Sequence, residues 1–302
     1  MKNDLTSLQQ SLASIASGEP VYQRWQDYRG HARWAGAADG KTGTQHLEYP
    51  PIEAPLVRGR LLMVPTGQAA PTRTEDTDTV YLGLDSDVEF TVGTQTLVVK
   101  PLDILCVPAG TPHGFANLSL ANALLCGIYA KSDGAPTPPK AEGPAPTLME
   151  WDTYRRDFHW TLPWSEQFGY HRGSGPLIIS DGLRGHTVRI PTGQTTPWHY
   201  AARDMLFMGI YHDVEFKAAN KSFKLGPHDF LIIPAGTPYS YHNHGLAECV
   251  FFSIGGKLPP GKKGTYFTTD PGWPIRADAK TMTVEIDAHG DARVVDGALP
   301  AR

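Results

Sequence analysis

The sequence has few cysteines, no block of basic residues and no long hydrophobic run. Cys106, Cys126 and Cys249 are odd in number and have apolar neighbours, which predicts buried thiols in a reducing compartment rather than a disulfide framework. A net charge of −4 without a Lys or Arg cluster lacks the electrostatic footprint of a protein that binds DNA, RNA or an anionic membrane. No stretch approaches the about 18 apolar residues of a membrane span, and residues 1–8 lack an apolar signal core. We therefore expect a soluble cytoplasmic protein with no nucleic-acid or membrane partner.

Turn residues and short strand patterns are abundant instead. The chain has 302 residues, with 31 glycines, 26 prolines and 10% aromatic residues, a composition typical of short strands joined by many turns. One helical pattern stands out, because Leu5, Leu8, Leu12 and Ile15 recur at helical spacing. The expected fold class is all-β, with a short N-terminal helix.

An internal repeat at a fixed offset of 126 residues organises the chain. The segment VPTGQ at 64–68 returns as IPTGQ at 190–194, and PAGTP at 108–112 returns unchanged at 234–238. Because no gap is needed between the copies, the chain arose by duplication of one unit.

The repeat and the composition divide the chain into five predicted segments. They are an N-terminal helical segment (1–24), a first barrel (25–131), a Pro/Ala/Gly-rich linker (132–148), a second barrel (149–257) and a C-terminal extension (258–302) with a probable strand at 281–286. We expect that strand to extend the edge of a barrel, since a bare edge promotes aggregation.

Both copies resemble the cupin superfamily in its second motif, Gly-x5-Pro-x-Gly-x2-His-x3-Asn. The first copy has Leu102, Pro108, Gly110, His113 and Asn117 at these positions, and the second has His228, Pro234, Gly236, Tyr239 and Asn243. The resemblance implies two tandem cupin barrels (double-stranded β-helix, jelly roll), that is, a bicupin.

The first cupin motif, Gly-x5-His-x-His-x3-4-Glu-x6-Gly, is degenerate in both copies. In the family, its two His and its Glu, with the His of the second motif, hold divalent Fe, Mn, Ni or Zn. The corresponding residues are Arg73, Glu75, Thr79 and His113 in the first copy, and His199, Ala201, Met205 and Tyr239 in the second. Neither copy has the family's ligand set.

Two non-standard metal sites remain to be considered. Glu75 and His113 could bind a metal in the first copy, and His199 and Asp204 could do so in the second. Strand alternation, however, places Asp204 on the opposite face from Met205 unless a bulge intervenes.

In the second barrel, His199 and Tyr239 are the candidate catalytic pair. An imidazole titrates near neutral pH and a phenol can return a proton, so the two could act as general base and general acid. Tyr241 and Asn243 are predicted to face the same interior and to contact a ligand. The alternative is that His199 is hydrogen-bonded in a polar interior and that Tyr239 fills the space of a lost ligand.

In the first barrel, Arg73, Glu75 and His113 are candidate substrate-binding residues. A buried arginine requires a partner, and Glu75 could form an internal ion pair with Arg73. Alternatively, Arg73 and His113 could bind a carboxylate or another anion of the ligand.

Three functions follow from these readings. The leading hypothesis is a bicupin that binds a small polar or anionic organic molecule in a barrel interior, with metal-independent acid/base chemistry of the isomerase or lyase type. The second is a metal-dependent dioxygenase or related oxidoreductase with non-standard ligands. The third is a non-catalytic ligand-binding or sensor protein. By resemblance only, we also expect a homodimer.

Overall fold

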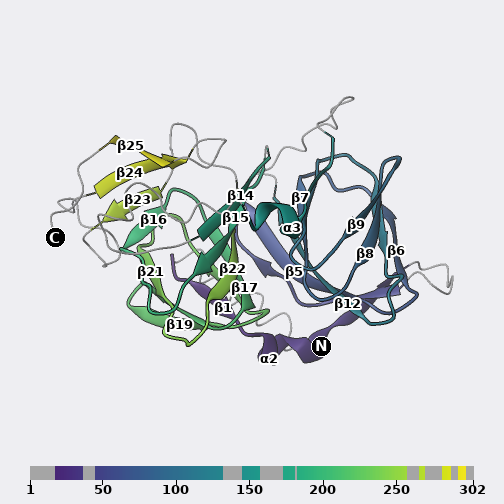
Figure 1. Cartoon of the computed structure of the whole chain (residues 1–302), viewed down its shortest axis with the longest axis horizontal. Coiled ribbons are helices and arrows are strands. Elements are labelled where there is room, and N and C mark those ends of the chain that lie inside the picture. The colour runs from purple at the N-terminus through teal and green to yellow at the C-terminus, as the bar shows by residue number, and fades with distance from the viewer. Residues whose placement is uncertain are drawn as a thin grey trace.

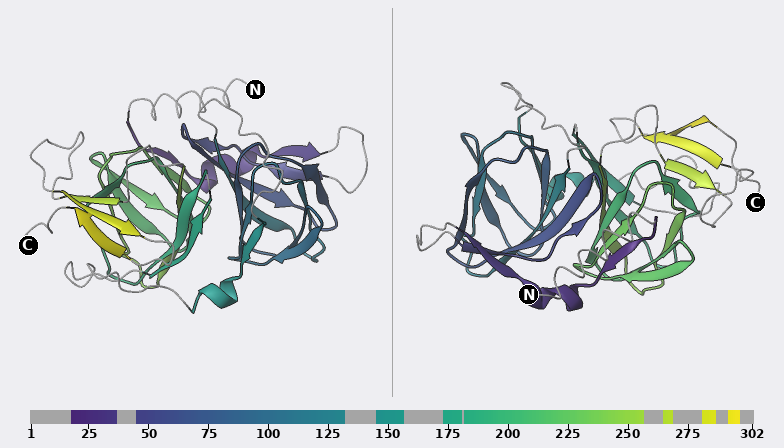
Figure 2. Two further views of the ribbon diagram at one scale, coloured as in Figure 1. Left: turned by 90° about the horizontal axis from the view of Figure 1, so that it is seen from above. Right: turned by 180° about the vertical axis from the view of Figure 1, so that it is seen from behind.

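A computed structural model shows two β-barrels side by side (Figures 1 and 2). The structure describes residues 18–36, 45–131, 145–156, 173–180, 182–256, 265–268, 281–286 and 292–296. The helix predicted from Leu5 to Ile15, and the linker up to residue 144, lie outside the described residues. Within the described residues, no helix has the length and apolar character needed to cross a membrane.

Two antiparallel sheets form the first barrel. One has the strand order β13-β10-β7-β12-β5-β3-β2, with β4 also paired to β5, and the other has the order β6-β11-β8-β9. The strands are β2 (Arg33–Gly36), β3 (Gln45–Glu48), β4 (Ile52–Glu53), β5 (Val57–Val64), β6 (Ala69–Arg73), β7 (Thr79–Gly83), β8 (Val88–Val92), β9 (Gln95–Val99), β10 (Ile104–Val107), β11 (His113–Ala116), β12 (Ala123–Ala130) and β13 (Thr147–Met149).

The second barrel repeats this pattern and is longer at one end. Its sheets have the orders β1-β20-β17-β22-β15-β14 and β19-β18-β21-β16-β23-β24-β25. The strands are β1 (Val21–Gln23), β14 (Gly173–Ile179), β15 (Arg184–Ile190), β16 (His199–Ala201), β17 (Met205–Tyr211), β18 (Val214–Ala218), β19 (Lys221–Leu225), β20 (Phe230–Ile233), β21 (Tyr239–His242), β22 (Cys249–Gly255), β23 (Thr265–Thr268), β24 (Thr281–Ile286) and β25 (Ala292–Asp296). β24 covers the residues of the predicted strand at 281–286 and joins the barrel through β23 and β16.

Strand alternation divides the apolar side chains between barrel interiors and a shared interface. In β12, Leu125 packs inside the first barrel, whereas its neighbours Cys126 and Ile128 belong to a cluster that also contains Leu206 and Phe252 of the second barrel. Because successive side chains of a strand point to opposite faces, a strand buried on both faces has a nearly continuous apolar sequence. This explains why every residue of β12 and β22 is buried. The two barrels share one hydrophobic interface.

Each barrel also receives a strand from the segment that precedes the other barrel. β1, which precedes the first barrel in the sequence, pairs with β20 of the second, and β13, which precedes the second, pairs with β10 of the first. The offset of 126 residues relates β1 to β13, so the exchange is reciprocal. The sequence predicts residues 21–23 within a helical segment, and it predicts that Met149 belongs to the second barrel. The structure corrects both assignments, because pairing partners distant in sequence decide where short strands lie.

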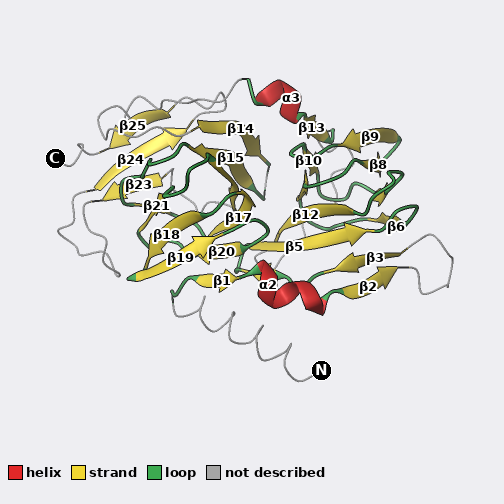
Figure 3. Ribbon diagram, turned by 60° about the horizontal axis from the view of Figure 1, so that its bottom comes forward, coloured by secondary structure: helices red, strands yellow, loops and turns green. Residues whose placement is uncertain are grey.

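Two short helices secure this exchange on opposite sides of the molecule (Figure 3). They are α2 (Trp25–Tyr28), which is followed by a 3-10 turn (Arg29–His31), and α3 (Trp151–Tyr154). The backbone N–H of Trp25 donates to Asp229 at 2.6 Å, and that of Trp151 donates to Asp103 at 2.7 Å. These aspartates satisfy N–H groups that the first turn of a helix leaves without a backbone acceptor. Equivalent carboxylates therefore fix equivalent helices to the opposite barrels.

Candidate functional site

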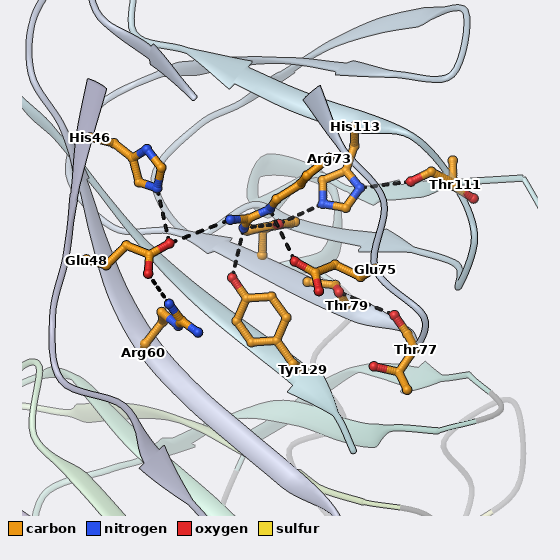
Figure 4. Close-up of polar contacts among 11 residues, drawn as sticks. His46, Glu48, Arg60, Arg73, Glu75, Thr77, Thr79, Thr111, His113 and Tyr129 are labelled. Carbon is orange, nitrogen blue, oxygen red and sulfur yellow. Dashed lines mark hydrogen bonds and ion pairs between the residues drawn. The ribbon is translucent and has the colours of Figure 1, made fainter. Parts of the chain in front are cut away.

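Arg73 lies near the centre of a polar cluster inside the first barrel (Figure 4). It is the last residue of β6, directly opposite His113 of β11 in the strand register. Its Nη2 donates to the hydroxyl of Tyr81 at 2.8 Å and to that of Tyr129 at 2.9 Å. Strands β6, β7 and β12 therefore bring together three side chains that are distant in sequence.

Two glutamates balance the arginines of this cluster. Nε of Arg73 lies 3.3 Å from Oε1 of Glu75, and its Nη1 lies 3.7 Å from Oε1 of Glu48. Glu48 also pairs with Arg60 and lies 3.2 Å from Nε2 of His46. The predicted Arg73–Glu75 ion pair is thus present, but Glu48 of β3 connects more members of the cluster.

The hydrogen bonds of His113 indicate a neutral imidazole. Its Nδ1 lies 2.9 Å from the carbonyl oxygen of Thr111, which can only accept, so Nδ1 carries the proton. Its Nε2 lies 2.8 Å from the hydroxyl of Tyr81 and accepts from it. Burial lowers the pKa of His113, and the charge of Arg73 acts in the same direction. Arg73, Tyr81 and His113 form a continuous hydrogen-bonded chain.

The charges in the cluster shift the pKa values of its members. The hydrogen bond from His46 and the charges of Arg60 and Arg73 lower the pKa of Glu48, outweighing its burial. Burial raises the pKa of Tyr81, although Arg73 opposes this effect. At neutral pH, Glu48 is therefore a carboxylate and Tyr81 a phenol.

Several nitrogen atoms of the cluster lack hydrogen-bond partners. Among the described residues, six buried side-chain atoms have no hydrogen bond, and four of them belong here, namely Nε of Arg58, Arg60 and Arg73 and Nδ1 of His46. Nε of Arg73 is within ion-pair distance of Glu75, yet it is one of these four, because distance alone does not make a hydrogen bond. Three of the four atoms are guanidinium N–H groups without an acceptor, whereas Nδ1 of His46 is an acceptor, because Nε2 of that ring donates to Glu48.

The donor set of the first barrel does not fit a divalent metal. The guanidinium of Arg73 occupies a position that is a ligand His in the cupin motif, and the Tyr81 hydroxyl blocks Nε2 of His113. Within the part of the chain that the structure describes, no group of three or more His, Cys, Asp or Glu side chains could hold a metal ion. A cation beside Arg73 would also be repelled. Glu75 pairs with Arg73 rather than joining His113 as a ligand.

The corresponding interior of the second barrel is aromatic. The rings of His199 and Tyr239, opposite each other on β16 and β21, have their centroids 4.2 Å apart. Tyr241 and Phe207 pack against these rings at 5.7 Å from His199 and 5.4 Å from Tyr239. Nδ1 of His199 donates to the carbonyl of Pro197 at 2.8 Å, so its tautomer matches that of His113. The predicted pair His199 and Tyr239 is in direct contact.

Two residues predicted for this second site have structural roles instead. The amide of Asn243 donates to the carbonyls of Ile190 and Ala247, both at 2.8 Å, and its Oδ1 accepts from Gly245. Asn243 thus has no free donor for a ligand. Asp204 accepts from the backbone N–H of Ala235 at 2.9 Å, and strand alternation places it on the opposite face from Met205. We remove Asn243 from the ligand site and Asp204 from the metal site.

Several members of the polar cluster were not predicted from the sequence. They are His46, Glu48, Arg60, Tyr81 and Tyr129. Alternation offered one usable signal, because Arg58, Arg60 and Leu62 share a face of β5, and Leu62 belongs to the interior cluster. Glu48 has no such signal, since β3 precedes both cupin motifs and only tertiary pairing brings it to β5.

Comparisons with known proteins show similarity in structure but not in sequence. No family model matches the chain, and no curated protein does. A salicylate 1,2-dioxygenase from Pseudaminobacter salicylatoxidans has a similar structure, with a TM-score of 0.58 and 13% identity over 79% of this chain and 84% of that chain. The chain has the cupin fold.

Two other cupin-fold structures are similar at comparable distances. AerE from Microcystis aeruginosa has a TM-score of 0.55 and 11% identity over 74% of this chain and 96% of that chain. A putative glyoxylate-induced protein from Pseudomonas aeruginosa has a TM-score of 0.53 and 13% identity over 68% of this chain and 76% of that chain. At such low identity, the similarity establishes the shared fold and leaves function to the site residues.

Proposed function

We propose that this bicupin binds a small organic anion in the first barrel, at the cluster around Arg73. The observation that carries the proposal is the concentration of unpaired guanidinium N–H groups at Nε of Arg58, Arg60 and Arg73. A buried donor without an acceptor costs about 1–3 kcal/mol. A ligand rich in acceptor oxygens, such as a carboxylate, would relieve this cost by accepting from the guanidinium groups.

The cluster is within reach of solvent and of a small molecule. The side chains of Arg73, Glu75 and Glu48 are 25%, 28% and 24% exposed, whereas His113 is only 1% exposed. The arginine therefore lies between solvent and the buried imidazole. A carboxylate could replace Glu75 beside Arg73, because the present contact at 3.3 Å lacks hydrogen-bond geometry.

The chain from Tyr81 to His113 supports acid/base chemistry without a metal. Tyr81 can donate its proton to the neutral imidazole of His113 as it takes a proton from a ligand, and the reverse transfer returns it. Arg73 stabilises the charged form of Tyr81, since the guanidinium opposes the rise in its pKa. We propose a proton shuttle of this kind for a non-oxidative reaction, such as an isomerisation or elimination.

Titration calorimetry with acetate and benzoate at constant ionic strength tests the binding proposal. Arg73→Gln should weaken binding in the first barrel about 10- to 100-fold, because charge-assisted hydrogen bonds to the ligand are lost. Arg73→Lys keeps the charge but loses the planar fork, and should bind with intermediate affinity.

Arg24→Gln is the matched control, because Arg24 pairs with Asp27 on the surface and is 50% exposed. Equal binding by Arg73→Gln and wild type would contradict the proposal. Elemental analysis of protein purified without chelators provides a second check. Stoichiometric Fe, Mn, Ni or Zn would favour the metal-dependent oxidoreductase instead.

A further inference from the structure

The second barrel contains an arginine where the first has a threonine. Arg203 lies in the turn between β16 and β17, and the offset of 126 residues relates it to Thr77. Thr77 Oγ1 donates to the carbonyl of Ala130 at 2.6 Å. Arg203 Nη1 reaches the equivalent carbonyl, that of Gly256, at 3.4 Å. The same backbone contact is therefore made by a hydroxyl in one barrel and, more weakly, by a guanidinium in the other.

The side chain of Arg203 runs along a space that opens because a tyrosine is missing. Tyr129 of the first barrel corresponds to Gly255 of the second. A Cβ atom placed on Gly255 would lie 2.8 Å from both Cδ and Nε of Arg203. In the first barrel, the side chain that starts at this position points inward and contacts Arg73. Arg203 therefore passes over the inner face of β22.

Each barrel thus has an arginine on its inner side, but the two arginines occupy positions that the repeat does not relate to each other. The positive charge of Arg73 is balanced by Glu75 and Glu48. Arg203 differs, because among the described residues no carboxylate lies within ion-pair distance of it, and its hydrogen bond of 3.4 Å to Gly256 is long. A partly buried cation without a counter-charge is unfavourable, so a balancing anion would stabilise it.

The surroundings of Arg203 also disfavour its positive charge. Burial lowers the pKa of Arg203 to about 10, and the charge of Arg184 lowers it further, while Tyr239 has the opposite effect. Arg184 lies opposite Gly255 in the strand register, and Arg203 passes over Gly255, so Arg184 is a second cation near Arg203. Tyr239 belongs to the same interior cluster as Ala201 and Met205, which flank Arg203, and its ring centroid lies 4.2 Å from that of His199.

We infer that the second barrel has its own binding site for a small carboxylate, centred on Arg203 and bordered by Tyr239 and His199. The guanidinium supplies the charge and the paired donors that a carboxylate prefers. This site does not depend on the anion site proposed for the first barrel.

Arg203→Thr is the informative variant because it copies the residue of the first barrel. A threonine at 203 can donate to Gly256 as Thr77 does to Ala130, so the fold should be retained. We expect a higher melting temperature without ligand, because an unbalanced charge is removed. Acetate and benzoate should bind about 10- to 100-fold more weakly at the second site. A residue that only supported the fold would lower the melting temperature when replaced.

Calorimetry on wild type, Arg73→Gln, Arg203→Thr and the double variant separates the two sites. Two sites in wild type, one in each single variant and none in the double variant would support both proposals. Binding that survives in Arg73→Gln and is lost in Arg203→Thr would support the second-barrel site and contradict the first. Acetate and benzoate affinities unchanged by Arg203→Thr, or a lower melting temperature of that variant, would overturn the inference.

Discussion

The two barrels share a backbone plan and differ in what their interiors contain. The first has Arg73, Tyr81 and His113 in a hydrogen-bonded chain, whereas the residues at the same positions in the second are His199, Phe207 and Tyr239. Both barrels keep the PAGTP turn and the asparagine that follows it, because these residues fix the course of the backbone. In the second barrel, the rings of Phe207 and Tyr239 pack against each other. The residues that shape the chain are therefore the same in the two barrels, whereas the residues that face the barrel interiors differ.

The largest expected effect concerns a feature that both barrels share. Gly83 and Gly209 are equivalent, and a Cβ on either would lie about 2 Å from a backbone carbonyl oxygen, at 2.1 Å from Lys100 and 2.0 Å from Gly226. Backbone cannot move aside cheaply, so Gly83→Ala and Gly209→Ala should each destabilise by about 4 kcal/mol or more. Urea unfolding measures this.

Gly30→Ala is the control, because no atom lies within 4 Å of a Cβ at that position. It should change the free energy of unfolding by less than about 1 kcal/mol. If alanine were tolerated at only one of positions 83 and 209, the two barrels would differ in their backbone packing as well as in their interiors.

The next effect concerns charge balance inside the first barrel. Glu48→Gln leaves Arg60 and Arg73 with less counter-charge, and breaking a buried pair costs about 3–5 kcal/mol. Since the Glu48 side chain is 24% exposed, we expect a smaller loss of about 2 kcal/mol in unfolding free energy.

Glu248→Gln in the second barrel is the matched control for Glu48→Gln. Glu248 pairs with Arg189 at 2.6 Å and is 29% exposed; within the described part of the chain it has this one basic partner, whereas Glu48 has three. Its replacement should cost about 1 kcal/mol or less. If the two variants lost equal unfolding free energy, Glu48 would contribute no more to stability than a glutamate in a simple ion pair does.

The smallest effect is a pH dependence arising from His113. Because burial lowers its pKa in the folded state, the folded protein binds fewer protons than the unfolded chain. Its contribution to stability therefore falls as pH drops through the unfolded value of about 6.5. Between pH 7 and 5, wild type should lose more stability than His113→Asn.

Unfolding curves at several pH values, with exposed His31→Asn as control, test this prediction. Glu48 does not interfere in this window, because its pKa is lowered and its contribution is lost only at more acidic pH. An identical pH profile for His113→Asn and wild type would show that His113 is not the titrating group.

Most of the fold could be predicted from the sequence, but only part of the site could. The ungapped repeat and the second motif identify two cupin barrels, because duplication and turn residues leave local signals. Arg73, Glu75 and His113 were identified for the same reason, since they occupy motif positions. Glu48 and Tyr129 were missed because they come from strands outside the motifs. Their role depends on pairings such as β3 with β5.

The sequence by itself determined the duplication, the turn chemistry and the loss of the usual metal ligands, since these depend on residue type and spacing. Only the tertiary structure decided that β1 and β13 exchange barrels, because pairing between strands that are distant in sequence is absent from local patterns. It also decided that Arg73 is balanced by two glutamates, whereas no carboxylate of the described residues lies within ion-pair distance of Arg203. Charge balance depends on distances in space, and strands that are remote in sequence set those distances.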